Sequence, residues 1–494
     1  MTGARTLAAA AAVFAAAGVA WALDPELRKL AKSAEASKRS DAAVALAKDG
    51  TPEAARVLVE LLEDREASVR DSAVVACRAV TDEEAVKALT SAARASDELT
   101  RRNAADALSR TRSPAALATL EVLATKDPSP QVRADALDSL WRFRGDAKAA
   151  AIAKAGAADA KPLVRAAAVE AAGRVGGDGA AEVAATARAD ADEGVCCVAM
   201  LAQRWVARAD AVAGLAAAAT DPRWRIRAQC VNDAEWLRDA AAVDALVALV
   251  GDKSVRVAAA AHRALQRLSG KDLGRDSELW AAWWASNRAA WKPPKGDLDR
   301  DVPDDPKRTA ARYHGLDVAT DAGVFVADLS GSMGDPVSAG DKRTRWSVAQ
   351  EELRATLAAL PDSFVMNLVF FKDASQTAFD RPLRLNRPAR DKAEAFIAAA
   401  APSHRGDLLG GVLAALASDD VDTVFVLSDG DPSGGDIVDR SRVRAAIRQR
   451  NRMRKCVIDT IGFGARTAAD RGLLENLAKD SGGRAVFRAM GDGK

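Results

Sequence analysis

The sequence predicts a multidomain fold: an all-α solenoid followed by an α/β doubly wound, Rossmann-like domain. A helical, Ala-rich motif recurs about every 30 residues through the first half of the chain, which is the signature of stacked repeats. From Gly323 onward, short apolar runs alternate with helical patterns, which indicates a mostly parallel sheet covered on both faces. With 494 residues, the chain also exceeds a single domain of ordinary size.

The composition excludes several classes of protein. The 71 Lys and Arg residues nearly balance the 69 Asp and Glu residues, and the net charge of +2 gives no electrostatic basis for binding nucleic acid. Aromatic residues make up only 4% of the chain, which disfavours a strand-rich sandwich and favours closely packed helices.

The cysteines argue against both a zinc knuckle and a disulfide framework, because they are odd in number and form no Cys-x-x-Cys pair. They are Cys77, Cys196, Cys197, Cys230 and Cys456. We expect them to be small buried apolar residues. One bridge between neighbouring repeats, from Cys230 to Cys196 or Cys197, is the alternative.

Residues 1–22 have the pattern of a secretory signal peptide. Arg5 gives a positive start, an apolar run follows to about residue 19, and Ala20-Trp21-Ala22 forms a small-x-small cleavage site. We therefore expect cleavage after Ala22 and an extracytoplasmic protein, either periplasmic or secreted. The alternative is an uncleaved N-terminal membrane anchor, because residues 6–23 are just long enough to span a bilayer. No second apolar run of about 18 residues occurs, so no other integral membrane segment is expected.

The repeat motif consists of an Asp, a few residues, Val-Arg and an Ala-rich helix, and it spans residues 23–270. The arginines of the motif are Arg39, Arg70, Arg101, Arg133, Arg165, Arg227 and Arg256, with Cys196 at the remaining position, in steps of 29 to 32 residues. In the third unit, Val132, Ala136 and Leu140 share one helical face, and Ser129 is a capping candidate. Each unit is predicted to be a helix pair that buries its apolar face against the next pair.

This pattern resembles the bacterial HEAT-like repeats, with about eight of them in an α-solenoid. The resemblance implies that the Arg of each repeat ties neighbouring loops together, a structural role. It says little about function. Some repeats of this type occur in phycobilin lyases, but nothing in this sequence forms a recognisable tetrapyrrole site, so a bilin-lyase-like enzyme is among the least favoured readings.

Residues 271–320 are predicted to be a Trp-rich helix and a linker. Trp280, Trp284 and Trp291 recur on one helical face, which favours a helix that caps the open end of the solenoid. The alternative is an exposed aromatic platform for a sugar or peptide. Residues 292–312 are rich in Pro and charge, which is typical of a linker.

The second half, residues 321–494, carries two polar turns that each follow an apolar strand. Asp328, Ser330 and Ser332 follow the run at 324–327, and Asp429 follows the run at 423–427. Further strands are predicted at 365–371 and 457–461, and helices at 347–360, 391–400, 408–416, 438–450 and 471–479. In an open parallel sheet the carboxyl ends of strands carry the ligand site. Hydroxyl and carboxylate oxygens are ligands that Mg²⁺ accepts.

Together the two turns resemble the von Willebrand factor A (VWA) domain and its metal-ion-dependent adhesion site (MIDAS). The resemblance implies that Ser330 and Ser332 bind Mg²⁺ or Mn²⁺ directly, and that Asp328 and Asp429 hold it directly or through water. The family usually offers Gly-Gly-Thr-Asp-Leu in its central loop, whereas this chain has Gly406 where the Thr ligand stands. Water or the Asp407 carboxylate could replace the missing hydroxyl. The alternatives are weak metal binding, or a structural remnant that only caps turns.

These features predict a non-enzymatic protein-protein interaction or adhesion-type scaffold. Its metal ion would accept an acidic side chain of a protein partner, although no partner-binding residue can be named. A metal-independent structural assembly scaffold is the main alternative. A metal-dependent hydrolase is the least favoured reading, because it needs a placed general base and the chain has only His262, His314 and His404. Of these, His404 is expected near the site, and no catalytic residue is predicted.

Overall fold

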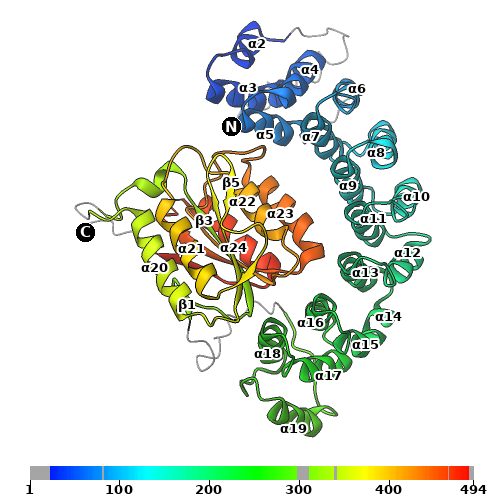
Figure 1. Cartoon of the computed structure of the whole chain (residues 1–494). Helices are drawn as coiled ribbons and strands as arrows, with labels where there is room; N and C mark the ends of the chain where they lie inside the picture. Colours follow the sequence, from blue (N-terminus) through cyan, green and yellow to red (C-terminus); the bar gives the residue numbers. More distant parts are fainter. Residues whose placement is uncertain (1–22, 80–82, 297–310, 339–341, 466, 489–494) are drawn as a thin grey trace, which may run out of the picture. The chain divides into compact units, whose positions relative to one another are not determined.

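The computed structural model describes residues 23–79, 83–296, 311–338, 342–465 and 467–488 (Figure 1). It divides into two compact units between Arg142 and Phe143, and each is considered by itself. The predicted signal peptide and most of the predicted linker lie outside the described residues. In the part of the chain that is described, no helix is both long and apolar enough to cross a membrane.

The first unit is built from helices that follow one another in pairs. Within it, α3, α5, α7 and α9 contact one another in succession, as do α4, α6 and α8. Several helices begin at a proline whose preceding Ser or Thr accepts a backbone N–H, a sequence pattern that favours helix initiation. The helices are α2 Pro25–Ala31, α3 Ala36–Asp49, α4 Pro52–Glu60, α5 Ala67–Cys77, α6 Glu83–Ala92, α7 Glu98–Leu108, α8 Pro114–Lys126 and α9 Pro130–Ser139.

The second unit continues the helical repeats and then forms the α/β domain. Here α11, α13, α16 and α18 contact one another in succession. The repeat helices are α10 Ala147–Gly156, α11 Pro162–Val175, α12 Ala180–Ala187, α13 Glu193–Val206, α14 Arg208–Ala213, α15 Leu215–Ala219, α16 Trp224–Leu237, α17 Ala240–Leu249, α18 Val255–Ser269 and α19 Ser277–Asn287. The predicted all-helical first half is thus confirmed over residues 23–290.

Arginines of the repeat motif tie neighbouring repeats together. Each donates through Nε and Nη2 to an Asp 25 or 26 residues later, at 2.6–3.0 Å, and through Nη1 to two carbonyls of its own loop. The pairs are Arg39–Asp64, Arg101–Asp127, Arg165–Asp190 and Arg227–Asp252. Such bidentate pairs fix geometry as well as charge. The linking role that the resemblance implied is therefore present at these positions.

The Trp-rich helix packs against the end of the repeats. Trp280 and Trp284 of α19 are buried among residues of α17 and α18. Their indole N–H groups donate to the Gly274 carbonyl at 2.7 Å and to Asp244 at 2.6 Å. This is the arrangement expected of a capping helix. The five cysteines are buried and unbridged, as expected for small apolar residues.

The α/β domain is formed around a mostly parallel sheet of seven strands among the described residues, in the order β5-β4-β3-β7-β8-β9, with β6 also paired to β4. Strands β4, β3, β7, β8 and β9 are parallel, whereas β5 and β6 pair antiparallel. Their bounds are β3 Ala322–Asp328, β4 Val365–Phe371, β5 Ser375–Thr377, β6 Leu383–Arg384, β7 Thr423–Ser428, β8 Val457–Phe463 and β9 Ala485–Arg488. A separate hairpin, β1 Arg312–Tyr313 and β2 Leu316–Asp317, precedes the sheet.

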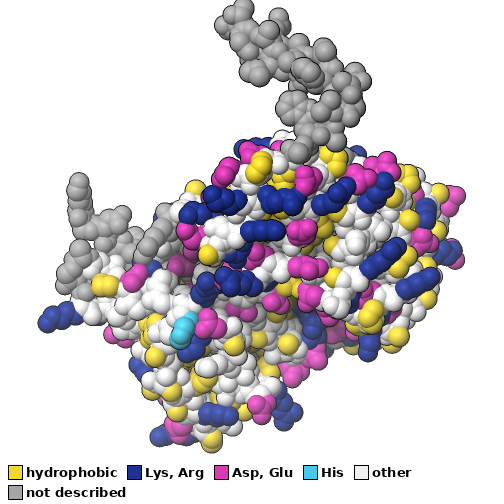
Figure 2. Space-filling model, turned by 90° about the horizontal axis from the view of Figure 1, so that it is seen from above, with side chains coloured by type: hydrophobic (Ala, Val, Ile, Leu, Met, Phe, Trp, Pro, Cys, Tyr) yellow, Lys and Arg dark blue, Asp and Glu magenta, His cyan; other side chains and the backbone are white. Residues whose placement is uncertain are grey.

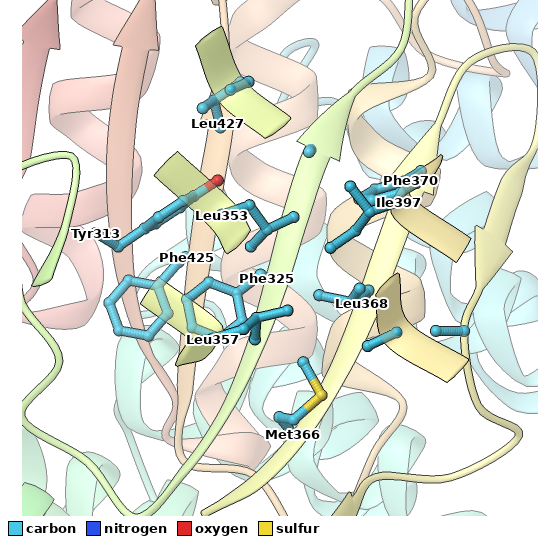
Figure 3. Packing of buried hydrophobic residues seen from close by; sticks show 14 of the residues in the cluster. Tyr313, Phe325, Leu353, Leu357, Met366, Leu368, Phe370, Ile397, Phe425 and Leu427 are labelled. Carbon is cyan, nitrogen blue, oxygen red and sulfur yellow. The ribbon is translucent and has the colours of Figure 1, made fainter. Parts of the chain in front are cut away.

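Helices cover both faces of this sheet, as predicted. The helices are α20 Arg345–Ala359, α21 Arg387–Ala399, α22 Leu408–Leu416, α23 Arg440–Arg454 and α24 Ala468–Ser481. One core contains α20, α21 and the hairpin, and Figure 3 shows its centre, where Phe325 and Phe425 stack at 5.0 Å beside Tyr313. The other core contains apolar residues of α22, α23 and α24. Burial of large apolar side chains on both faces is the main stabilising contribution.

Within the second unit, the last turn of α23 packs against the repeats. Arg225 donates to the Arg454 carbonyl at 3.0 Å, and Arg256 donates to the Lys455 carbonyl at 2.8 Å. These guanidinium groups satisfy carbonyls at the negative end of a helix. Arg256 was predicted to be the last of the motif arginines that tie neighbouring repeats together, and this prediction is wrong. Arg256 follows Arg227 by 29 residues instead of 31, and two residues correspond to about 200° around a helix, so its side chain faces another way.

Candidate metal site

The candidate site lies where the strand order of the sheet reverses. From β3 the chain continues to β4 on one side, and β7 then pairs with β3 on the other side. Asp328 is the last residue of β3, and Ser428 is the last residue of β7. The carboxyl ends of β3 and β7 are therefore adjacent at the switch point, where ligands bind in open α/β sheets.

The carboxylate of Asp328 accepts hydrogen bonds from both turns and so joins them. Its side chain is 1% exposed, and its Oδ1 accepts the Ser330 backbone N–H at 2.7 Å. Its Oδ2 accepts the Ser428 hydroxyl at 3.0 Å, which joins the two strand ends. Burial, followed by the negative charge of Asp429, raises the pKa of Asp328 to about 7.

Ser330, Ser332 and Asp429 form a continuous chain of oxygen atoms. The Ser330 and Ser332 hydroxyl oxygens lie 3.1 Å apart, and the Ser332 hydroxyl donates to Asp429 Oδ2 at 2.9 Å. Ser332 lies in the short helical turn Gly331–Gly334, and Ser330 is the residue directly before it. The Gly331 N–H of this turn donates to the His404 carbonyl. Four of the five predicted ligand residues, Asp328 included, are thus brought together.

Gly406 occupies the position where the resemblance places a threonine. A Cβ added to Gly406 would lie 3.2 Å from Ser330 Cβ and 3.4 Å from Asp328 Oδ1, so a side chain there would face the site. The Gly406 N–H donates to the Ser433 hydroxyl at 2.9 Å. The Ser433 hydroxyl thus lies directly beside the position that lacks one.

Asp407 lies apart from the other predicted ligands. Its Oδ1 accepts the Gly410 N–H at 2.8 Å and so caps the N-terminus of α22. The carboxylate also lies against Gly435, since a Cβ added there would be 2.3 Å from Asp407 Oδ1. Burial raises the pKa of Asp407. Its predicted part in metal binding would therefore compete with a structural capping role.

The site opens into a cavity of about 300 Å³. Its lining comprises Ser330, Gly331, Ser332, His404, Asp429, Asp431, Ser433, Arg440, Gly464, Thr467 and Asp470. The Arg440 guanidinium pairs with Asp431 at 2.7 Å and with Asp470 at 2.5 Å, so these two carboxylates are already engaged. Ser433, Arg440 and Asp470 were not predicted from the sequence. Only Ser433 lies in a local pattern, the Asp-x-Asp-x-Ser spacing of residues 429–433 after β7.

The donors present fit a hard divalent cation. They are hydroxyl and carboxylate oxygens, the ligands preferred by Mg²⁺ and Mn²⁺. The described residues contain no group of three or more His, Cys, Asp or Glu side chains arranged for a metal ion. A metal ion here would therefore depend on serine hydroxyls and on two carboxylates, Asp328 and Asp429.

The three histidines lie in different surroundings. His404 lines the cavity but is exposed, and its Nδ1 is 3.6 Å from Asp373 Oδ2. His262 is buried in the repeats beside Asp272, and His314 is buried in the turn between β1 and β2. On the face of the molecule shown in Figure 2, basic and acidic side chains are intermingled, in keeping with the net charge of +2.

Comparison with known families finds a match in each half of the chain. Residues 324–487 match the model of the von Willebrand factor type A domain. Residues 23–98, 57–141 and 120–196 match the HEAT repeat model. The chain carries HEAT repeats followed by a VWA domain. Both kinds of domain are commonly protein-interaction modules, which indicates an interaction scaffold. No curated protein matches the chain.

Solved structures resemble the chain in parts. A von Willebrand factor type A protein from Catenulispora acidiphila is 17% identical over 34% of this chain, with a TM-score of 0.29, and this chain covers 38% of its length. An aerotolerance-related membrane protein from Bacteroides fragilis is 11% identical over 34% of this chain and 91% of its own, with a TM-score of 0.27. Human deoxyhypusine hydroxylase is 18% identical over 49% of this chain and 95% of its own, with a TM-score of 0.22. These likenesses concern the fold alone.

Proposed function

We propose that this protein is a non-enzymatic, extracytoplasmic interaction scaffold whose VWA domain binds Mg²⁺ or Mn²⁺ and, through the ion, an acidic side chain of a partner protein. The observation that carries the proposal is the chain of oxygen atoms from Ser330 through Ser332 to Asp429, which spans the ends of β3 and β7 and borders an open cavity. The extracytoplasmic location is supported by the signal-peptide pattern of residues 1–22.

Each residue has a definite part in this proposal. Ser330, Ser332 and Asp429 would hold the ion, and Asp328 keeps the Ser330 turn and the end of β7 in register. The ion, when bound, supplies an electrophilic centre that can accept a carboxylate oxygen. Because Asp429 is the only charged group among these three ligands, a bound divalent ion would keep part of its positive charge and would attract an anionic side chain.

Metal binding can be tested on the full chain after treatment with a chelator. Isothermal titration with Mg²⁺ and with Mn²⁺ is expected to give saturable binding that Ser332→Ala weakens by at least about tenfold, since one ligand is removed. Ser286→Ala is the matched control, because Ser286 is exposed on α19 and bonds only to the Ala282 carbonyl of its own helix. Absence of binding by the unaltered protein at millimolar metal would favour the metal-independent scaffold.

Partner recognition requires a second experiment. Candidate partner proteins captured on immobilised full-length protein should be released by a chelator and should not be captured by Asp429→Asn. Circular dichroism of the variant should match that of the unaltered protein, since Asp429 lies on a turn. Capture that is equal with and without metal would contradict the proposed mode of binding.

A further inference from the structure

A second cavity, of about 430 Å³, lies within the second unit between the repeat helices and the VWA domain. Its walls come from α11, α13, α16 and α18 on the repeat side and from α23 and α24 on the VWA side. It shares no lining residue with the candidate metal site. Its volume falls within the range of small-molecule sites.

The lining of this cavity is strongly basic. The cationic residues are Arg174, Arg204, Arg256, Arg448, Arg452, Lys455 and Lys479, whereas the acidic ones are Glu170, Glu235 and Asp480. Seven cations stand against three carboxylates in the lining, and one of the seven, Arg204, pairs with Asp233 behind the lining at 3.3 Å, which leaves an excess of three positive charges. A protein with a net charge of only +2 has therefore concentrated cations at this place.

The three carboxylates are already engaged. Glu170 is shared by Arg174 at 2.6 Å and Arg452 at 2.8 Å. Asp480 pairs with Arg444 at 2.6 Å, and Glu235 pairs with Arg267. Because Arg444 and Arg267 are not lining residues, two of the three negative charges are directed partly away from the cavity.

The positive charges of two lining residues, Arg256 and Lys455, are only partly compensated. Arg256 is 5% exposed, its Nη2 donates to the Lys455 carbonyl, and its Nε and Nη1 have no hydrogen-bond partner among the described residues. The Lys455 ammonium is acted on by the charges of Asp233 and Glu170, which only partly offset the effect of its burial. Burial lowers the pKa of Lys455 and of Arg256. Buried cations whose charge is only partly compensated are costly, so an anion in the cavity would be stabilising.

We infer that this cavity binds a small phosphate-bearing molecule, such as a phosphate ester or a diphosphate. The cations come from five different helices, and an anion with several oxygen atoms can reach more of them than a single carboxylate can. Guanidinium groups also match phosphate geometry well. Trp205 forms part of the wall, with the Arg174 guanidinium 5.1 Å from its ring, and offers an apolar surface for an organic portion.

The inference is tested by isothermal titration of inorganic diphosphate into the full chain at low ionic strength. Arg448→Gln and Lys455→Met should each weaken binding by about tenfold, the usual effect of losing one charged hydrogen-bond donor. Arg448 is exposed, so its replacement leaves the packing intact. The control is Arg387→Gln, which removes the same charge from an 88% exposed side chain on α21.

Saturable binding by the unaltered protein and by Arg387→Gln, weakened in the two cavity variants, would support the inference. Titration with a nucleoside diphosphate gives a second measurement, and tighter binding than that of inorganic diphosphate would support a seated organic portion. Absence of saturable binding at millimolar diphosphate would overturn the inference. Equal binding by all four proteins would also overturn it, because the anion would then bind elsewhere.

Discussion

Arg452 Nη1 lies 2.8 Å from Glu170 Oε2, and this ion pair joins the VWA domain to the HEAT repeats within the second unit. The two side chains are only 7% and 9% exposed. Burial acts to raise the pKa of Glu170, but the charges of Arg452 and then Arg174 outweigh it and hold the pKa well below its usual value. The pair is therefore ionised in the folded protein.

Glu170→Gln is expected to lower the free energy of unfolding by about 3–5 kcal/mol, because the buried Arg452 guanidinium would lose the carboxylate of Glu170. Chemical denaturation followed by circular dichroism measures the change. Glu182→Gln is the control, since Glu182 pairs with Lys154 at 2.9 Å but is 67% exposed, and exposed pairs contribute at most about 1 kcal/mol. Equal losses in the two variants would show that burial of the Arg452 pair does not matter.

The Arg–Asp pairs that tie neighbouring repeats together give a second prediction. Arg227 and Asp252 are 5% and 7% exposed, and Arg227 also donates to the Asp221 and Pro222 carbonyls. Arg227→Ala should therefore destabilise the repeats by about 3 kcal/mol or more. Arg288→Ala removes a comparable but exposed pair with Asp244, and it should cost less than about 1 kcal/mol. Thermal unfolding of both variants tests the contrast.

Much of the fold could be predicted because its signals are local. The recurring Val-Arg motif predicted the helical repeats, and the apolar runs predicted the bounds of β4 and β7 to within one residue. The polar turns after β3 and β7 identified Ser330, Ser332 and Asp429, because parallel strands end at the same edge of a sheet. The hairpin of β1 and β2 was not predicted, because strands of two residues have no detectable periodicity.

Other features depend on contacts between residues far apart in the sequence. Arg256 meets Lys455 across 199 positions, and Glu170 meets Arg452 across 282, so neither leaves a local pattern. The capping role of Asp407 depends on the exact start of α22, and boundaries are the least certain part of sequence reasoning. Ser433 was missed because its relation to Gly406 arises only when the loop after β7 folds back on the central loop.

A third prediction concerns pH. His314 lies in the turn between β1 and β2 at φ +49°, is 3% exposed, and neither ring nitrogen has a hydrogen-bond partner among the described residues. Burial, with a smaller effect from the charge of Arg488, lowers its pKa from 6.5 to about 3. Below pH 6.5 the unfolded chain therefore binds a proton that the folded domain does not bind until about pH 3.

The free energy of unfolding should consequently fall by about 1.4 kcal/mol for each pH unit below 6.5 on account of His314. The variant His314→Asn lacks the titrating group, and Asn tolerates the positive φ. Denaturation at pH 7.5 and pH 5 should show a smaller acid loss for the variant than for the unaltered protein, by about 2 kcal/mol. Parallel losses would mean that His314 is protonated without cost in the folded state.

The last prediction concerns the residue beside Gly406. The Ser433 hydroxyl accepts the Gly406 N–H at 2.9 Å and lines the same cavity as Ser330, Ser332 and Asp429. We expect it to supply, directly or through water, the hydroxyl ligand that a threonine provides in the family. Ser433→Ala should then lower the affinity for Mg²⁺ and Mn²⁺ by about tenfold, the usual scale for a supporting ligand.

Ser403→Ala is the matched control, because Ser403 lies on the neighbouring loop, contacts Lys372 at 3.3 Å and does not line the cavity. Isothermal titration should show weaker metal binding for Ser433→Ala and unchanged binding for Ser403→Ala. If the unaltered protein binds metal and Ser433→Ala binds it equally well, Ser433 has no part in the site and Gly406 leaves a position for solvent. If the unaltered protein binds no metal, the metal-dependent function itself fails, and the Ser433 hydroxyl then only holds the central loop against β7.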